Sequence, residues 1–178
     1  NVALITPFKD NNLDEESYIK LINFHLENNT NGLVPAGTTG ESPTLSHKEH
    51  EKVIDHIRHC GFKPGLVVNP ETPIKSMSYL INLVDRILLM AVNPGFSAQP
   101  YINSTSKKIT ELRNISPTIE IVIDGGMNEN TMKEVISLGA DAGVVCSVIL
   151  KAPDHQQKIE SLKESCFSGI RNRKTQDH

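Results

Sequence analysis

Polar residues suited to binding and proton transfer follow several short apolar runs of this sequence. The segment GLVPAGTTGESPTL, residues 32–45, runs from an apolar stretch into a loop of Gly, Thr and Glu whose composition suits an acidic ligand. Another run, IEIVID, ends at Asp124 and continues into Gly125 and Gly126. Glycine lets the backbone approach an anion without a clashing side chain, and a positioned carboxyl group can transfer protons. Working groups are therefore expected where the apolar runs end.

The elements that position these groups alternate between strands and helices. Runs rich in Val, Ile and Leu alternate with longer stretches of helical period, which predicts βα units around a parallel sheet. Ser46 with Glu49 forms a capping box, and Asn128 can cap the helix that follows it. The predicted strands are 2–6, 32–35, 65–69, 86–92, 119–123 and 142–146, and the predicted helices lie near 14–28, 46–60, 73–83, 104–114, 129–138 and 154–165.

The pattern favours a TIM-barrel-type α/β fold over an open doubly wound sheet, because no G-x-G-x-x-G fingerprint follows any predicted strand. Units of roughly 30 residues give about six strands in this length, whereas a closed (βα)8 barrel needs eight. The expected architecture is an incomplete or partner-completed barrel. Unpaired sheet edges invite association, so a homo-oligomer that completes the barrel is one expectation.

Composition excludes several classes of partner. The 178 residues carry a net charge of -3, with a pI of about 6.2, which predicts no nucleic-acid or anionic membrane partner. Three widely spaced cysteines predict neither a disulfide framework nor a zinc cluster, which favours a reducing cytoplasm. The sequence also shows no leader and no apolar run of membrane length. The first residue, Asn1, directly precedes a predicted strand, which suggests that the natural N-terminus lies further upstream.

The front of the chain, residues 1–55, contains the motifs ALITPF and GLVPAGTTGESPTLSHKEHEKVI. With these motifs it resembles dihydrodipicolinate synthase and its pyruvate-dependent aldolase relatives. The resemblance implies that Thr38 and Thr39 bind a pyruvate carboxylate through hydroxyls and backbone N–H groups. That family forms a Schiff base on a lysine of a late strand, yet no predicted strand here contains lysine.

The rest of the chain, residues 56–166, contains the motifs GFKPGLVVNPETP, RILLMAVNPGFSAQ, IEIVIDGGMNENT and LGADAGVVCSVI. With these motifs it resembles the last four βα units of ribulose-phosphate 3-epimerase. Residues 167–178 are expected to form a polar, disordered tail. The change of family falls within SHKEHEKVIDHIRHCG, residues 46–61.

The epimerase resemblance implies a set of site residues. Asp124 matches the family's second catalytic aspartate, which is also a ligand of the divalent metal (zinc, or iron or manganese). Backbone N–H groups at Gly95, Gly125, Gly126 and Ser147 match those that hold the phosphate of a small phosphorylated sugar, and Met90 matches a methionine that lines the site. The family's other aspartate and two histidine ligands lie on strands that this chain lacks. Weak metal binding and impaired activity are therefore expected.

Three functional hypotheses remain open on the sequence. The first is an isomerase that interconverts ribulose 5-phosphate and xylulose 5-phosphate by proton transfer at C3. The second is a pyruvate-dependent lyase of the dihydrodipicolinate synthase type. The third is a catalytically silent phosphate-binding fusion, natural or engineered, or a misjoined fragment. These residues also have a purely structural interpretation. In it the glycines matched to the phosphate site serve only tight turns, Met90 belongs to the core, and Cys146 is a small buried residue.

Overall fold

The computed structural model describes residues 2–30, 32–34, 45–93, 95 and 99–174. They form two compact units, Asn1–Pro64 and Gly65–His178. The units divide just beyond the helix in which the sequence resemblance changes. Among the described residues, no helix is both long enough and apolar enough to cross a bilayer.

The first unit combines short strands with two helices. The strands are β1 (Val2–Ala3), β2 (Phe8–Lys9), β3 (Asn12–Leu13) and β4 (Leu33–Val34), and the helices are α1 (Glu15–Glu27) and α2 (His47–His59). β1 pairs with β4 in parallel, as two βα units require. β2 and β3 form an antiparallel hairpin that the sequence analysis did not predict. Its turn residues, Asp10 and Asn11, have φ of 52° and 62°, a left-handed conformation that Asp and Asn tolerate.

The helices of this unit begin at side-chain caps. Asp14 accepts a hydrogen bond from the Ser17 N–H at 3.1 Å at the start of α1. The capping box predicted at Ser46 and Glu49 is confirmed, with the Ser46 N–H donating to Glu49 Oε2 at 2.7 Å. A core of Leu4, Leu13, Tyr18, Ile22 and Val53 lies between the helices and the strands.

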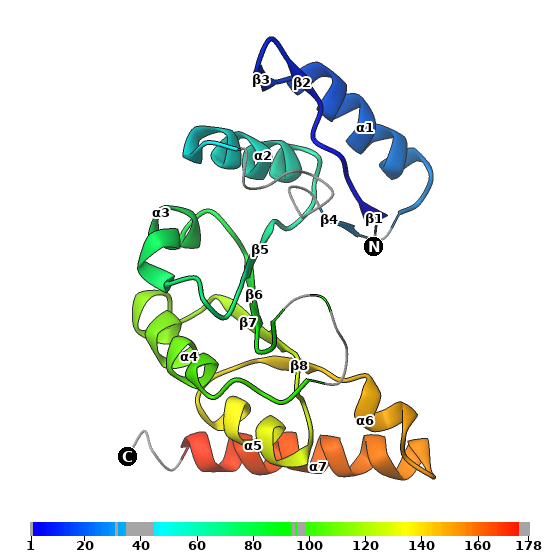
Figure 1. Ribbon diagram of the computed structural model, residues 1–178, viewed down its shortest axis with the longest axis vertical. Helices are drawn as coiled ribbons and strands as arrows, with labels where there is room; N and C mark the ends of the chain where they lie inside the picture. Colours follow the sequence, from blue (N-terminus) through cyan, green and yellow to red (C-terminus); the bar gives the residue numbers. More distant parts are fainter. Residues whose placement is uncertain (1, 31, 35–44, 94, 96–98, 175–178) are drawn as a thin grey trace. The chain divides into compact units, whose positions relative to one another are not determined.

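The second unit is a four-stranded parallel sheet with helices between successive strands (Figure 1). The strand order is β5 (Gly65–Val68), β6 (Arg86–Met90), β7 (Glu120–Asp124) and β8 (Ala142–Val144). The helices are the 3-10 helix η2 (Ile74–Met77), α3 (Ser78–Ile81), α4 (Ser104–Ile115), α5 (Glu129–Ser137), α6 (Ser147–Leu150) and α7 (His155–Lys174). The predicted parallel α/β arrangement is thereby confirmed in this unit.

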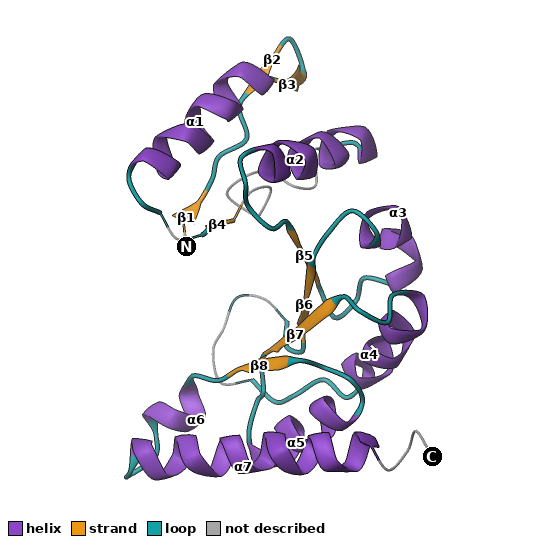
Figure 2. Ribbon diagram, turned by 180° about the vertical axis from the view of Figure 1, so that it is seen from behind, coloured by secondary structure: helices purple, strands orange, loops and turns teal. Residues whose placement is uncertain are grey.

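The two faces of the sheet differ in burial. Residues of alternate positions point to opposite faces of a strand. Ile87, Leu89, Ile121 and Ile123 are fully buried, and α3, α4 and α5 lie along one side of the sheet in Figures 1 and 2. The opposite face is half-buried or exposed. We call this the open face, and its residues include Val67, Arg86, Leu88, Met90, Glu120, Val122, Asp124, Ala142 and Val144.

Two expectations from the sequence are wrong. The helix predicted over 73–83 begins as 3-10 helix and is α-helical only over Ser78–Ile81. The polar tail predicted at 167–178 is helical up to Lys174 as part of α7, while residues 175–178 lie outside the described part. A Cβ added at Gly169 would lie 2.7 Å from the Lys133 carbonyl oxygen, so α7 packs against α5 through this glycine.

Candidate functional site

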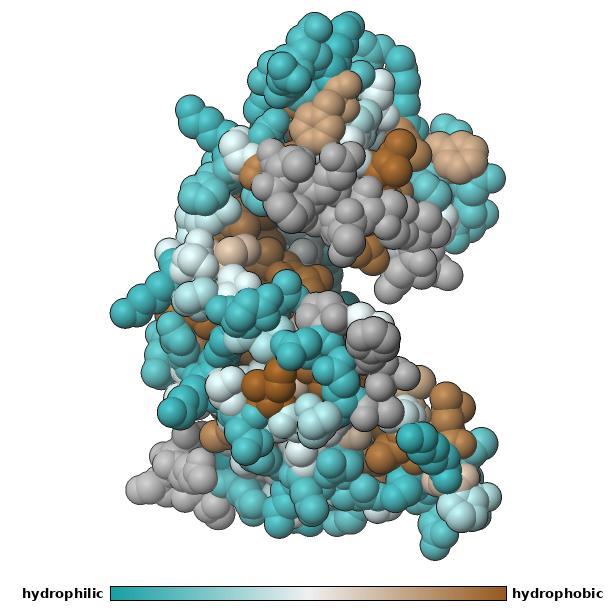
Figure 3. Space-filling model, in the orientation of Figure 1, coloured by the Kyte–Doolittle hydropathy of each residue, from teal (hydrophilic) through white to brown (hydrophobic). Residues whose placement is uncertain are grey.

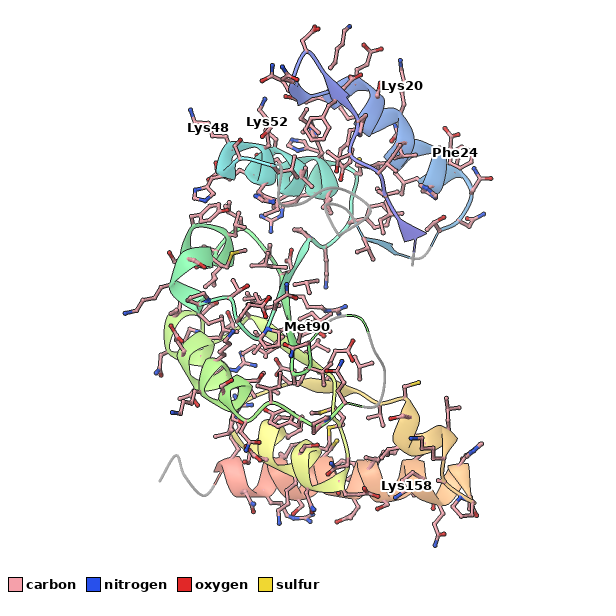
Figure 4. The ribbon with its side chains drawn as sticks, in the orientation of Figure 1. Lys20, Phe24, Lys48, Lys52, Met90 and Lys158 are labelled. Carbon is pink, nitrogen blue, oxygen red and sulfur yellow. The ribbon has the colours of Figure 1, made fainter. Side chains whose placement is uncertain are left out.

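The candidate site lies where the strands of the second unit end. The register places Met90 of β6, Asp124 of β7 and Val144 of β8 in one row across the sheet. Met90, labelled in Figure 4, is the last residue of β6, and Asp124 is the last residue of β7. The carboxyl ends of parallel strands are where TIM-barrel enzymes hold their catalytic groups. The structure thus brings together two of the residues predicted from the sequence, Met90 and Asp124.

Asp124 is the only carboxylate in this row. Its side chain is half-buried, and the described residues offer it no hydrogen-bond or ion-pair partner. Burial raises the pKa of the Asp124 carboxyl above its ordinary value because the charged form loses hydration. The Ala91 N–H donates to the Asp124 carbonyl at 2.6 Å and fixes the end of the strand. A carboxyl group in such surroundings is suited to accept and return a proton.

The two glycines after Asp124 are required by packing. Gly125 has φ of 110° and Gly126 has φ of 66°, both in the left-handed region. A Cβ at Gly125 would lie 2.5 Å from a Val92 methyl carbon, and one at Gly126 would lie 2.5 Å from the Tyr101 backbone nitrogen. The turn therefore packs directly on the segment that follows β6, which gives both glycines a structural role whether or not they also bind phosphate.

The other residues predicted to bind phosphate follow neighbouring strands. Gly95 has φ of 126°, and a Cβ there would meet no described atom within 4 Å. Ser147 is half-buried at the start of α6, three residues beyond Val144, the last residue of β8. Cys146 is exposed, so the interpretation of it as a small buried residue is wrong. The structure places both Gly95 and Ser147 after the carboxyl ends of strands, where the prediction requires them.

Sequence reasoning missed the side chain that fixes the loop after β5. The Lys108 ammonium, from α4, donates to the carbonyl oxygens of Asn69, Pro70 and Thr72 at 2.9, 2.7 and 2.6 Å. Lys108 is half-buried, unlike its exposed neighbour Lys107. No signal in the sequence distinguishes the two lysines, because the contact joins segments at least 36 residues apart.

Hydrogen bonds from α4 and α5 support the turn at Gly125 and Gly126. The hydroxyls of Tyr101 and Ser106 lie 2.9 Å apart, and Ser106 Oγ donates to Glu134 at 2.7 Å. Thr131 Oγ1 donates to the Gly126 carbonyl at 3.1 Å, and the cap predicted at Asn128 is confirmed. These contacts connect α4 and α5 to the residues around the turn.

The described side chains do not fit a divalent-metal site. Among the described residues no three His, Cys, Asp or Glu side chains group together, and the row of the candidate site contributes one carboxylate. Structural and catalytic zinc sites use three or four protein ligands. His56 of α2 lies 3.3 Å from Glu15 within the first unit.

The carboxylate-binding residues predicted in the first unit, Thr38 and Thr39, lie outside the described residues. The described strands of the parallel sheets contain no lysine, in agreement with the sequence prediction. The only lysine on a described strand is Lys9 of the hairpin.

The fold and the position of Asp124 define a TIM-barrel-type α/β protein. A monomeric dihydrodipicolinate synthase variant superimposes with a TM-score of 0.63 at 20% identity, covering 96% of this chain and 59% of that one. A crystal structure of another dihydrodipicolinate synthase gives 0.55 at 20% identity, with 98% and 77% coverage. At these identities the likeness concerns the fold alone.

The chain belongs to the ribulose-phosphate 3 epimerase family, whose model matches residues 41–150. A model of the dihydrodipicolinate synthetase family matches residues 1–62. The two matches overlap over residues 41–62, which include α2, and the predicted resemblance to two families is confirmed.

Curated relatives carry both names. A ribulose-phosphate 3-epimerase of Aquifex aeolicus is 35% identical over 142 residues, 77% of this chain and 64% of that protein. The chloroplastic ribulose-5-phosphate-3-epimerase of Arabidopsis thaliana is 38% identical over 120 residues, 64% of this chain and 42% of that protein. A 4-hydroxy-tetrahydrodipicolinate synthase of Pelagibacter ubique is 80% identical over 109 residues, 61% of this chain and 36% of that protein. The chain thus spans between 36% and 64% of the lengths of these relatives.

Proposed function

We propose that the chain is an epimerase that acts on a phosphorylated ketose, interconverting ribulose 5-phosphate and xylulose 5-phosphate by proton transfer at C3. The observation that carries the proposal is Asp124, a half-buried carboxylate without a described partner at the carboxyl end of β7. It lies within the region matched by the epimerase family.

In this mechanism Asp124 removes the C3 proton, which is acidic because C3 lies next to the ketone. The charge of the resulting enediolate needs stabilisation by hydrogen-bond donors in a site from which water is excluded. Inversion also needs a second acid that returns a proton to the opposite face of the carbon. Within one described sheet, Asp124 is the only acid in the row at the strand ends.

The substrate phosphate would bind beside this group. A Cβ at Gly95 would meet no described atom within 4 Å, and Gly125, Gly126 and Ser147 follow the ends of β7 and β8. Gly125 and Gly126 are held against Val92 and Tyr101, so their backbone is set before any ligand binds. Such preorganisation lowers the cost of ordering a loop around a ligand.

The test follows ribulose 5-phosphate by NMR with wild type and two variants, with and without added Zn²⁺ or Mn²⁺. Asp124→Asn removes the proposed base. Glu120→Gln is the matched control because Glu120 lies at the other end of the same strand and face, where it pairs with Arg86 at 2.7 Å. We expect xylulose 5-phosphate from wild type and Glu120→Gln and a loss of at least about 100-fold with Asp124→Asn. Equal rates for all three, or no product from folded wild type, would refute the proposal.

A pyruvate-dependent lyase is less well supported. Its carboxylate loop is present in the sequence, and the front of the chain matches the dihydrodipicolinate synthetase family. The chemistry nevertheless requires a lysine nucleophile, and none lies on the described parallel strands.

A further inference from the structure

The short segment that precedes α4 lies against two parts of the candidate site. The Ile102 N–H donates to the Ala91 carbonyl at 2.8 Å, and the Ala91 N–H donates to the Asp124 carbonyl at 2.6 Å. The backbone of Tyr101 packs on Gly126, where an added Cβ would lie 2.5 Å from the Tyr101 nitrogen and 2.6 Å from its Cα. A displacement of this segment would therefore move the turn after β7.

The Tyr101 side chain holds this segment through a chain of hydrogen bonds that runs in one direction. Ser106 Oγ donates to the Glu134 carboxylate at 2.7 Å, which uses the single hydroxyl proton of the serine. The Tyr101 hydroxyl lies 2.9 Å from Ser106 Oγ, and it is therefore the donor of that bond. Burial raises the pKa of the Tyr101 hydroxyl above its ordinary value, so the hydroxyl keeps its proton near neutral pH.

Helix α5 restrains the turn in two ways. Thr131 Oγ1 donates to the Gly126 carbonyl at 3.1 Å, and Glu134 of the same helix ends the chain that begins at Tyr101. The carbonyl of Gly126 and the backbone that packs on its Cα are thus both held from α5. Such restraints matter because glycine samples more backbone conformations than other residues, and Gly126 has a φ of 66°.

We propose that Tyr101 is a positioning residue for the substrate phosphate: the hydrogen bonds from its hydroxyl through Ser106 to Glu134 hold the turn at Gly125 and Gly126 in its phosphate-binding conformation. Tyr101 acts through the backbone of the turn and not by contact with the phosphate. Backbone N–H groups that are already in place bind an anion more tightly, because less conformational entropy is lost on binding. The identity of the ligand as a sugar phosphate rests on the proposed epimerase function.

Loss of this restraint should change affinity rather than turnover. The phosphate is remote from C3, so a looser turn weakens the binding of substrate and transition state alike, which raises KM and leaves kcat unaltered. One hydrogen bond corresponds to a change of about two- to tenfold in a binding constant. Hydrophilic side chains cover most of the visible surface of the second unit (Figure 3). Glu134 is also exposed, so water competes for its carboxylate and we expect about fivefold.

The first test titrates the full chain with inorganic phosphate and follows the Gly125 and Gly126 amides by NMR. Tyr101→Phe and Ser106→Ala should raise the dissociation constant of phosphate about fivefold. Glu134→Ala, which changes only an exposed side chain, should also raise it. Ser106→Thr keeps a hydroxyl and should restore the wild-type value, and Ser104→Ala is the matched control because Ser104 is exposed in the first turn of α4. Unchanged affinity in folded Tyr101→Phe or Glu134→Ala, or no phosphate binding by wild type, would overturn the proposal.

The second test measures steady-state kinetics with ribulose 5-phosphate. Tyr101→Phe should raise KM by the same factor as the dissociation constant of phosphate and leave kcat within about twofold of wild type. A fall in kcat at unchanged KM would contradict the positioning role. A wild type that binds inorganic phosphate, and loses affinity for it in the variants, but converts no ribulose 5-phosphate would refute the proposed function and leave the role of Tyr101 standing. The two failures are therefore distinguishable.

Discussion

Lys108 should contribute more to the stability of the second unit than Lys107, the other lysine of α4. Its ammonium donates to three backbone carbonyls of the loop after β5, at 2.6 to 2.9 Å. Hydrogen bonds from a charged donor each contribute about 1.5–3 kcal/mol when buried. Because Lys108 is half-buried, water replaces part of this in a variant, and we expect Lys108→Met to lower the free energy of unfolding by about 2–3 kcal/mol.

The assay is urea and thermal unfolding of Lys108→Met beside Lys107→Met, a control on the same helix whose side chain is exposed. A loss of that size lowers Tm by roughly 8–12 °C in a unit of about this length. Hydrogen exchange should also accelerate at the Thr72 amide, which bonds to the Asn69 carbonyl at 3.1 Å within the same loop. Equal stability of the two variants, with unchanged exchange at Thr72, would refute this reasoning.

Three further predictions concern the candidate site. Gly126→Ala should lower the free energy of unfolding in urea by at least about 2 kcal/mol more than Gly95→Ala. Both glycines have positive φ, but only Gly126 lies against the backbone of another described segment. Equal losses of stability in the two variants would contradict the packing argument. Burial raises the pKa of the Asp124 carboxyl, so the folded state favours its protonated form. The protonated form therefore adds to the free energy of unfolding at low pH, and this addition is lost as pH rises through the pKa of the folded state. Asp124→Asn should therefore unfold at higher urea than wild type at pH 7, and the gap should close below pH 3.8, the ordinary pKa of Asp; a gap that widens in acid would count against it. Borohydride reduction with pyruvate should leave the intact mass unchanged, and an adduct on any lysine would reopen the lyase hypothesis.

The parallel strands and most helix boundaries were predictable because their signals are local. Strand β7 follows from the apolar run that precedes Asp124, and α2 begins at a capping box written in adjacent residues. The hairpin of β2 and β3 escaped prediction because strands of two residues show no periodicity. The last turns of α7 escaped it because Gly169, which weakens an isolated helix, here allows close contact with α5.

The candidate site was predictable only in part. Asp124 and the turn after it could be located from the sequence because a carboxylate and two glycines end an apolar run. The demands on Gly125 and Gly126 come from Val92 and Tyr101, which precede them by more than 20 residues and meet them only in the folded chain. Tertiary contacts of this kind leave no local trace in a single sequence.

The proposed epimerase function depends most directly on proton abstraction by Asp124. Ribulose 5-phosphate incubated with the folded chain in deuterated buffer, and analysed by NMR for deuterium at C3, reports this step alone, with or without inversion. We expect deuterium incorporation with wild type and with Glu120→Gln, and a rate of incorporation at least about 100-fold lower with Asp124→Asn. Incorporation that persists undiminished in Asp124→Asn would contradict it.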